Sequence, residues 1–263
     1  MTAKDGKASF WEHLDILRAA ILRTLAVWSV FSILAFILKE QLFDVVLAPK
    51  SPDFVTYRAL DALCARFGLE APAPFHVQLI NTGLAQQFII HMRTAFCAGV
   101  VLTAPFALYQ LFCFVAPGLY SHERKYVTSV VVSGYIMFLL GALLSYYIIF
   151  PLTFQFLGTY QVADDVVNMI SLDSYMSTFI LMGLCMGVVF ELPVLAWLLA
   201  KMGLLSASMM TGYRKHSIVV ILTVAAIITP TSDVFTLLVV SLPIWLLYEV
   251  SVLIVRSASR KRG

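Results

Sequence analysis

Charged residues are scarce in this 263-residue sequence: Asp, Glu, Lys and Arg make up 13% of it, whereas apolar residues make up 60%. A soluble chain of this length needs far more charge to cover its surface. The scarcity therefore excludes an ordinary soluble domain and predicts an all-α, polytopic membrane protein. The length fits a single membrane domain, residues 1–263, without a separate soluble enzyme.

Motifs for covalent or metal chemistry are also missing. The four cysteines form no C-x-x-C pair, and Cys97, Cys113 and Cys185 lie in apolar runs, where cysteine usually acts as a small hydrophobe. We therefore expect neither a disulfide framework nor a metal site. No H-E-x-x-H, G-x-S-x-G, P-loop or G-x-G-x-x-G sequence occurs. These absences lead us to expect no enzymatic activity, no cofactor and no nucleic-acid partner. The formal charge of +3 says little about partners, because lysine and arginine favour cytoplasmic loops of membrane proteins whatever their function.

Long apolar runs are what the sequence does contain. The first covers residues 19–38, about 20 residues, which is the length that a bilayer requires and too long for a signal peptide. Five more runs follow, at 94–115, 126–150, 175–200, 217–228 and 234–255. We expect the third to stop at Pro151, and the fifth, of about 12 residues, is too short to cross unaided. These runs predict six transmembrane helices.

The segments between the runs predict the remaining architecture. Residues 1–18 form a charged, amphipathic N-terminal segment. Residues 39–92 contain a short amphipathic helix over 57–67, closed by Gly68, and we expect them to fold as a helical cap on the outer side. The predicted kinks and turns lie at Pro49, Pro105, Pro117 and Asp233.

Basic residues predict the orientation. Most of the eighteen lysines and arginines lie near the N-terminus, in the segments 116–125 and 201–216, and after residue 255. The connection 151–173 contains none. Under the positive-inside rule this pattern puts both termini in the cytoplasm.

Two acids attract attention. Glu191 lies inside the fourth run, about ten residues from Lys201, which is ~15 Å into the membrane at ~1.5 Å per residue. A charge there costs at least ~2.5 kcal/mol, so this side chain must face protein or a wet cavity, either as a functional group or as a structural carboxyl. Glu123 lies in the short basic turn after the second run, and we hypothesise that it docks a basic peptide. The alternative is a surface acid paired with Arg124 or Lys125.

Five motifs occur in order over nearly the whole chain: FWEHLDILR at 10–18, Ala104-Pro105 with Tyr109-Gln110, FVAPGLY at 114–120 followed by His122-Glu123-Arg124, FELP at 190–193, and Thr229-Pro230 to Asp233. In content and spacing they resemble the TatC family, the receptor core of the twin-arginine protein translocase. The resemblance implies six helices in one concave bundle, in the bacterial inner membrane. It also implies recognition of twin-arginine signal peptides and export of folded proteins, driven by the proton gradient.

The resemblance also implies partners and sites. The partners are twin-arginine signal peptides, single-span TatA-like and TatB-like subunits, further copies of the chain and the lipid bilayer. The implied peptide-binding residues are Glu123, Asp15, Glu12, Arg18, Phe114 and Gln110. The residues implied to meet partner subunits are Glu191, Thr229 and Pro230.

One position departs from the family pattern. The family has glutamate two residues before the arginine of its N-terminal motif, and this chain has Ile16 there. Either Asp15 or Glu12 takes that role, and a shift of one residue turns a helical side chain by about 100°. The short fifth and sixth runs suggest local thinning of the bilayer. The alternative function is a proton-coupled small-solute transporter using Glu191, which the absence of matching broken helices in the two halves disfavours.

Overall fold

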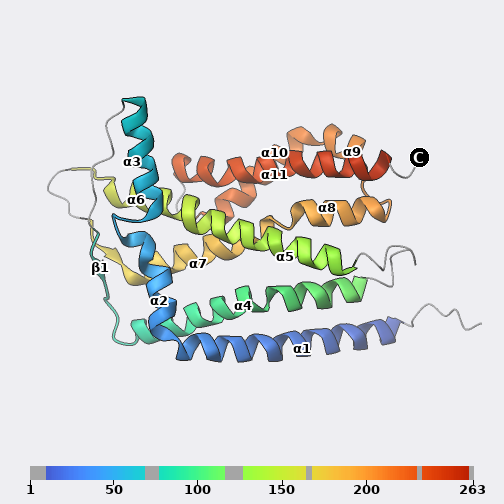
Figure 1. Cartoon of the computed structure of the whole chain (residues 1–263), viewed down its shortest axis with the longest axis horizontal. Helices are drawn as coiled ribbons and strands as arrows, with labels where there is room; N and C mark the ends of the chain where they lie inside the picture. Colours follow the sequence, from blue (N-terminus) through green and yellow to red (C-terminus); the bar gives the residue numbers. More distant parts are fainter. Residues whose placement is uncertain (1–9, 69–76, 116–126, 164–167, 230–232, 261–263) are drawn as a thin grey trace, which may run out of the picture.

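The structure is a computed structural model that describes residues 10–68, 77–115, 127–163, 168–229 and 233–260. Long helices run side by side along the long axis of the molecule, and short elements lie across one end (Figure 1). In chain order the elements are α1 (Phe10–Ile37), α2 (Lys39–Leu47), η1 (Ala48–Lys50), α3 (Val55–Phe67), β1 (Leu79–Ile80), α4 (Gln86–Val115), α5 (Val127–Leu144), η4 (Ser145–Ile149), α6 (Phe150–Thr159), β2 (Ile170–Ser171), α7 (Leu172–Val189), α8 (Leu192–Lys201), α9 (Ala207–Gly212), α10 (Arg214–Ile228) and α11 (Val234–Arg260).

The described part of the chain has five helical segments that are long and apolar enough to cross a membrane. They are Leu14–Ile37, Gln86–Phe114, Val130–Thr159, Leu172–Lys201 and Val234–Ala258. The prediction of an all-α, polytopic membrane protein is therefore confirmed. The fifth predicted run forms α10, whose 15 residues extend only ~22 Å. The sixth run is not short, as the sequence suggested, because α11 continues for 27 residues.

The third span does not stop at Pro151, contrary to the prediction. A π-helical turn, η4, joins α5 to α6, and Pro151 is the second residue of α6. Proline cannot donate to the carbonyl four residues before it, here that of Tyr147. The hydroxyl of Thr56 donates to that carbonyl instead. Because the wide turn and the borrowed donor accommodate the proline, the helix continues to Thr159.

The fourth span is broken at Phe190 and Glu191, between α7 and α8. Upstream of the break, α7 contributes Tyr175, Met182 and Met186 to the main core. The ring of Tyr175 meets that of Phe150 edge to face at 5.0 Å, and its hydroxyl donates to the carbonyl of Val46 at 3.0 Å. The core therefore ties α7 to α6 and to α2.

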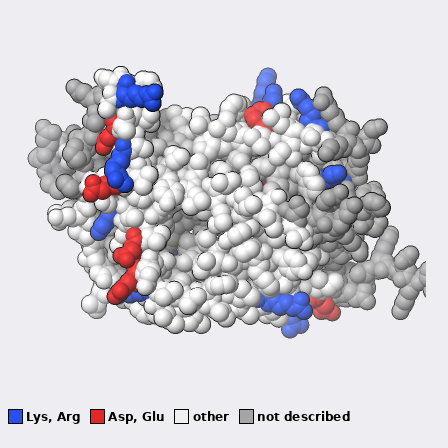
Figure 2. Space-filling view, in the orientation of Figure 1, with Lys and Arg blue, Asp and Glu red and all other residues white. Residues whose placement is uncertain are grey.

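The ends of the molecule differ in character. At one end lie α2, α3 and the parallel pair β1–β2, in which Leu79 aligns with Ile170. At the other end, α1 begins, α4 ends, α5 begins and α11 ends (Figure 1). On the face shown in Figure 2, charged side chains gather toward the two ends, with a broad uncharged band between them. This is the pattern expected of a bundle that crosses an apolar layer.

The predicted turn residues take different places. Gly68 ends α3 with a left-handed φ of 66°, as predicted for a helix closed by glycine. Pro49 is buried in η1, and its carbonyl accepts a hydrogen bond from the hydroxyl of Tyr57 at 2.9 Å. Pro105 lies inside α4. Asp233 precedes α11, and its Oδ1 accepts from the amide of Thr236 at 2.6 Å. Pro117 lies outside the described residues.

Candidate functional site

The last turns of α4 and the first turns of α1 form a groove at the end of the bundle where α1 begins and α11 ends. From α4, the groove is lined by Gln110 and Phe114, two of the residues expected to bind the peptide. Leu17 and Ile21 of α1 line the opposite wall, and the groove has a volume of about 250 Å³. Its lining is apolar apart from the side chains of Gln110 and Thr24. The structure thus brings together residues that lie about 90 positions apart in the sequence.

A second, shallower groove adjoins the first and shares Leu17 and Ile21 with it. Asp15 and Arg18 line this second groove, of about 500 Å³. The two side chains are three residues apart on α1 and therefore lie on one side of the helix. Both are exposed, and no ion pair joins either of them to another side chain in the described ranges. A carboxylate and a guanidinium are therefore both exposed beside apolar side chains of the same helix.

The structure does not describe the side chains of the other two acids expected to bind the peptide. Glu12 belongs to the first turn of α1. Glu123 lies outside the described residues, in the connection from α4 to α5. The flanking helix ends, Val115 and Val127, lie at the same end of the molecule as the start of α1 (Figure 1).

Glu191 lies at the break between α7 and α8, near the middle of the long axis (Figure 1). The residue is only 8% exposed. Its carboxylate lies against α5 at Gly134, where an added Cβ would be 3.0 Å from Oε2 and 3.4 Å from Oε1. Oε1 is buried without a hydrogen-bond partner among the described residues. A buried acceptor that lacks a donor is costly, so this carboxyl is suited to accept a hydrogen bond from an incoming group.

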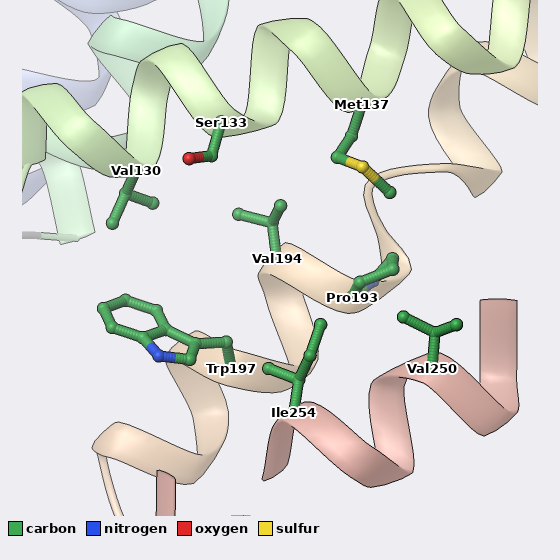
Figure 3. A pocket seen from close by; sticks show the side chains of 8 residues that line it. All are labelled: Val130, Ser133, Met137, Pro193, Val194, Trp197, Val250 and Ile254. Carbon is green, nitrogen blue, oxygen red and sulfur yellow. The ribbon is translucent and has the colours of Figure 1, made fainter. Parts of the chain in front are cut away.

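Next to this break, α5, α8 and α11 surround an apolar groove of about 380 Å³. Figure 3 shows side chains of all three helices pointing into it; they are Val130, Ser133, Met137, Pro193, Val194, Trp197, Val250 and Ile254. The hydroxyl of Ser133 is the polar group on the α5 wall. Lys201 lies one turn beyond Trp197, with its Nζ 5.9 Å from the ring centroid. The groove therefore runs from the broken helix toward a cation.

The predicted site residues between α10 and α11 are not among those that line these grooves. Thr229 directly follows α10 and is buried, and its hydroxyl donates to the carbonyl of Ala226 at 3.4 Å. Asp233 caps α11, and Pro230 lies outside the described residues. The structure gives no contact between Thr229 and Glu191, although the same kind of partner was expected for both.

Sequence reasoning missed two features of the site. The first is Gly134, whose missing side chain makes room for the Glu191 carboxylate. The second is an ion pair between Arg214 of α10 and Glu249 of α11, 2.6 Å between Nη2 and Oε2. Among the acids in apolar runs, only Glu191 was assigned a role from the sequence, but Glu249 also lies within a candidate span. The position of Glu249 in an apolar run could have identified it as an acid within a span, but its pairing with Arg214 could not be inferred from the spacing of the two residues.

Within the described ranges, no group of three or more His, Cys, Asp or Glu side chains could hold a metal ion. The arrangement offers surfaces for non-covalent binding. It consists of exposed charges beside an apolar groove at one end, and a buried carboxyl beside a second apolar groove further in. Such surfaces bind peptides or helices that combine charge with apolar length.

Comparisons with known proteins agree with this arrangement. The family model described as "Sec-independent protein translocase protein (TatC)" matches residues 12–243. TatC of Desulforapulum autotrophicum is 33% identical over the whole of this chain and 89% of its own length. TatC of Helicobacter pylori J99 is 42% identical over 68% of this chain and 71% of its own.

A solved structure is also similar. The crystal structure titled twin arginine translocase receptor TatC superimposes with a TM-score of 0.76 at 27% identity, covering 95% of this chain and all of that one. With the family model matching most of the sequence, the conclusion is direct: the chain belongs to the TatC family of Sec-independent protein translocase proteins.

Proposed function

We propose that this chain, a TatC subunit of the twin-arginine translocase in the bacterial inner membrane, is the receptor for twin-arginine signal peptides. The peptide binds where α1 begins and α4 ends. The observation that carries the proposal is the pair of adjoining grooves that share Leu17 and Ile21. One has an exposed carboxylate at Asp15, and the other is apolar up to Gln110 and Phe114.

The two grooves match the two parts of such a peptide. A guanidinium binds a carboxylate through two parallel hydrogen bonds, and hydrogen bonds to charged groups contribute ~1.5–3 kcal/mol. A lysine ammonium cannot form this fork, so the carboxylates select arginine. We assign the carboxylate role to Glu123 together with Asp15 or Glu12, and Asp15 is favoured because it lines the groove. The apolar groove then takes the apolar segment of the peptide.

The same proposal covers membrane topology. α10 forms the sixth crossing although its 15 residues are too few for a hydrocarbon core of ~30 Å, so the bilayer thins beside it. Both termini face the cytoplasm, as the distribution of lysine and arginine favours. Residues 1–18 then form the cytoplasmic N-terminal segment and residues 39–92 the outer cap of one concave bundle.

The partners of the translocase follow from Glu191 and the groove among α5, α8 and α11. We propose that single-span TatA-like and TatB-like subunits bring a polar side chain to Glu191, whose Oε1 lacks a donor among the described residues. Thr229 and Pro230 contact such a subunit at the far end of α10, and further copies of the chain complete the complex. The chain itself catalyses no covalent step and needs no cofactor.

Site-specific photocrosslinking tests the receptor proposal. A photoreactive residue at Gln110 or Phe114 should crosslink a twin-arginine precursor in membranes, and Asp15→Ala and Glu123→Ala should each reduce the yield severalfold. Asp44→Ala, which removes an exposed acid from α2 at the opposite end, is the matched control and should leave the yield unchanged. Equal yields from all three variants would overturn the proposed site.

The alternative function, a proton-coupled small-solute transporter using Glu191, makes a separate prediction. Proteoliposomes containing this chain alone would take up a small solute, and Glu191→Gln would abolish the uptake. No observation of the structure favours this alternative over the receptor, and the family membership supports the receptor.

A further inference from the structure

Helix α3 lies across the end of the bundle opposite the termini rather than along the long axis (Figure 1). Its first turn is fixed to the junction of α5 and α6. The hydroxyl of Thr56 donates to the carbonyl of Tyr147, and that of Tyr57 donates to the carbonyl of Pro151 at 3.2 Å. The ring of Phe54, just before α3, stacks on that of Tyr147 at 5.8 Å. The N-terminal end of α3 is thus attached at the level of residues 147–151.

Two helices place that level at the edge of the hydrocarbon layer. Along α5 and η4, the distance from Val130 to Tyr147 is ~25 Å at ~1.5 Å per residue. Between Arg23 of α1 and Lys39, where α2 begins, the chain has no charged residue and extends ~24 Å by the same measure. Both lengths lie within about 6 Å of the ~30 Å of a hydrocarbon core. α3 therefore lies at the depth of the lipid headgroups, parallel to the membrane plane.

The sides of α3 have different characters. Tyr57 faces the bundle and is buried, while Arg58 and Asp61 are exposed. Leu63 is 53% and Phe67 73% exposed. Successive helical residues turn by about 100°, so Phe67 is half a turn from Arg58, and Leu63 points nearly opposite to Asp61. One flank is thus charged and the other apolar, on either side of the line of contact with the bundle.

The apolar surface of the bundle leads up to this helix. Exposed apolar side chains recur at helical spacing along α5 and η4 and end at the attachment point; they are Ile136, Leu140, Leu143 and Tyr147. A stripe of this kind faces lipid in a membrane-spanning helix. Because the ring of Tyr147 stacks on Phe54, the lipid-facing stripe continues to the start of α3.

We propose that α3 is an interfacial anchor of the phospholipid bilayer, in the leaflet opposite the termini. Leu63 and Phe67 insert among the acyl chains just below the headgroups. Arg58 and Asp61 face water, and Arg66 reaches a lipid phosphate along its aliphatic stem. The helix thereby holds the short elements at this end of the bundle at a fixed depth.

A second copy of the chain or another protein is the competing occupant of this flank. The exposed flank of a 13-residue helix with two large apolar side chains covers only a few hundred Å², whereas a stable interface buries about 800 Å² per partner. The depth of the helix and the continuous stripe below it favour lipid, which needs no such area.

Spin-label accessibility separates the two occupants. The full chain, with its four native cysteines replaced by alanine, is reconstituted in phosphatidylcholine–phosphatidylglycerol vesicles with one label at position 58, 61, 63 or 67. Labels on Leu63→Cys and Phe67→Cys should collide readily with oxygen and rarely with a water-soluble nickel chelate, and those on Arg58→Cys and Asp61→Cys should show the reverse. High nickel accessibility at 67 would mean that this flank faces water, and low accessibility to both reagents would mean that protein covers it. Either result overturns the proposal.

A second measurement does not depend on the cysteine-free variant. In the chain with its native cysteines, a photoreactive phenylalanine derivative at Phe67 should form adducts with phospholipid, detected by mass, and the same group at Arg58 should not. Adducts with protein at 67, or no adduct there, would contradict the anchor.

Discussion

The crossing of α5 and α7 depends on a glycine. An added Cβ at Gly141 of α5 would lie 2.5 Å from the carbonyl oxygen of Met186 and 2.8 Å from the Cβ of Phe190. Real Cβ atoms essentially never approach so closely, and the carbonyl is part of the backbone of α7, so it cannot rotate away. Gly141→Ala must therefore push the two helices apart.

The net effect can be worked out from two opposing contributions. Replacing a helical glycine by alanine gains ~0.5–1 kcal/mol of helix stability. Overpacking a well-packed contact costs ~1–3 kcal/mol. We expect Gly141→Ala to lower the free energy of unfolding by up to about 2.5 kcal/mol, and the loss should appear as a lower midpoint when the detergent-solubilised protein is titrated with SDS.

Gly183 of α7 provides the matched control. A Cβ added there meets nothing within 4 Å, so Gly183→Ala keeps only the gain in helix propensity and should be neutral or slightly stabilising. If Gly141→Ala were as stable as Gly183→Ala, the close crossing of α5 and α7 described above would be wrong.

Three further predictions follow from other contacts. Tyr57→Phe should cost ~1–3 kcal/mol, because the carbonyls of Pro49 and Pro151 lose their donor. Burial raises the pKa of the Tyr57 phenol above its ordinary value. The stabilisation by this phenol is therefore complete below about pH 10 and is lost as the pH rises further. Between about pH 8 and pH 11 the unfolding midpoint should fall less in Tyr57→Phe than in the wild type, and an equal fall would refute this. Because Glu249 of the pair Arg214–Glu249 lies within a candidate span, a double-mutant cycle should give a coupling above the ~0.2–1 kcal/mol of a pair in water, and a coupling within that range would mean that water reaches the pair. Gly134→Ala should displace the Glu191 carboxylate by a few tenths of an ångström and weaken crosslinking of a single-span subunit beside α8, whereas Gly183→Ala should not; unchanged crosslinking in Gly134→Ala would argue against Glu191 as the contact.

Local patterns in the sequence predicted the helices well. Apolar runs located the spans, and the helix at 57–67 closed by Gly68 is present with the expected left-handed glycine. The prediction failed at Pro151, because the rule that proline ends a helix considers only neighbouring residues in the sequence. The donor that satisfies the freed carbonyl comes from Thr56, 91 residues away, and a contact of that range leaves no local signal.

The candidate site could be predicted from the sequence only in part, for a similar reason. Glu191 was identified because an acid in an apolar run is costly wherever it lies. Its setting, against the backbone of Gly134, depends on how α5 and α8 pack and could not be inferred. The approach of Leu17 and Ile21 to the end of α4 also depends on packing, and the sequence suggested it only through resemblance to a family. The pairing of Arg214 with Glu249 was missed altogether.

The central claim is that carboxylates at the end of the bundle select paired arginines, and a binding measurement tests it most directly. The chain in nanodiscs is titrated with a fluorescent twin-arginine peptide and with the same peptide carrying two lysines. If each fork contributes ~1.5–3 kcal/mol, the wild type should prefer the arginine peptide by at least roughly tenfold. In the double variant Asp15→Ala/Glu123→Ala the two peptides should bind alike. A preference for arginine that survives in this variant would contradict the account.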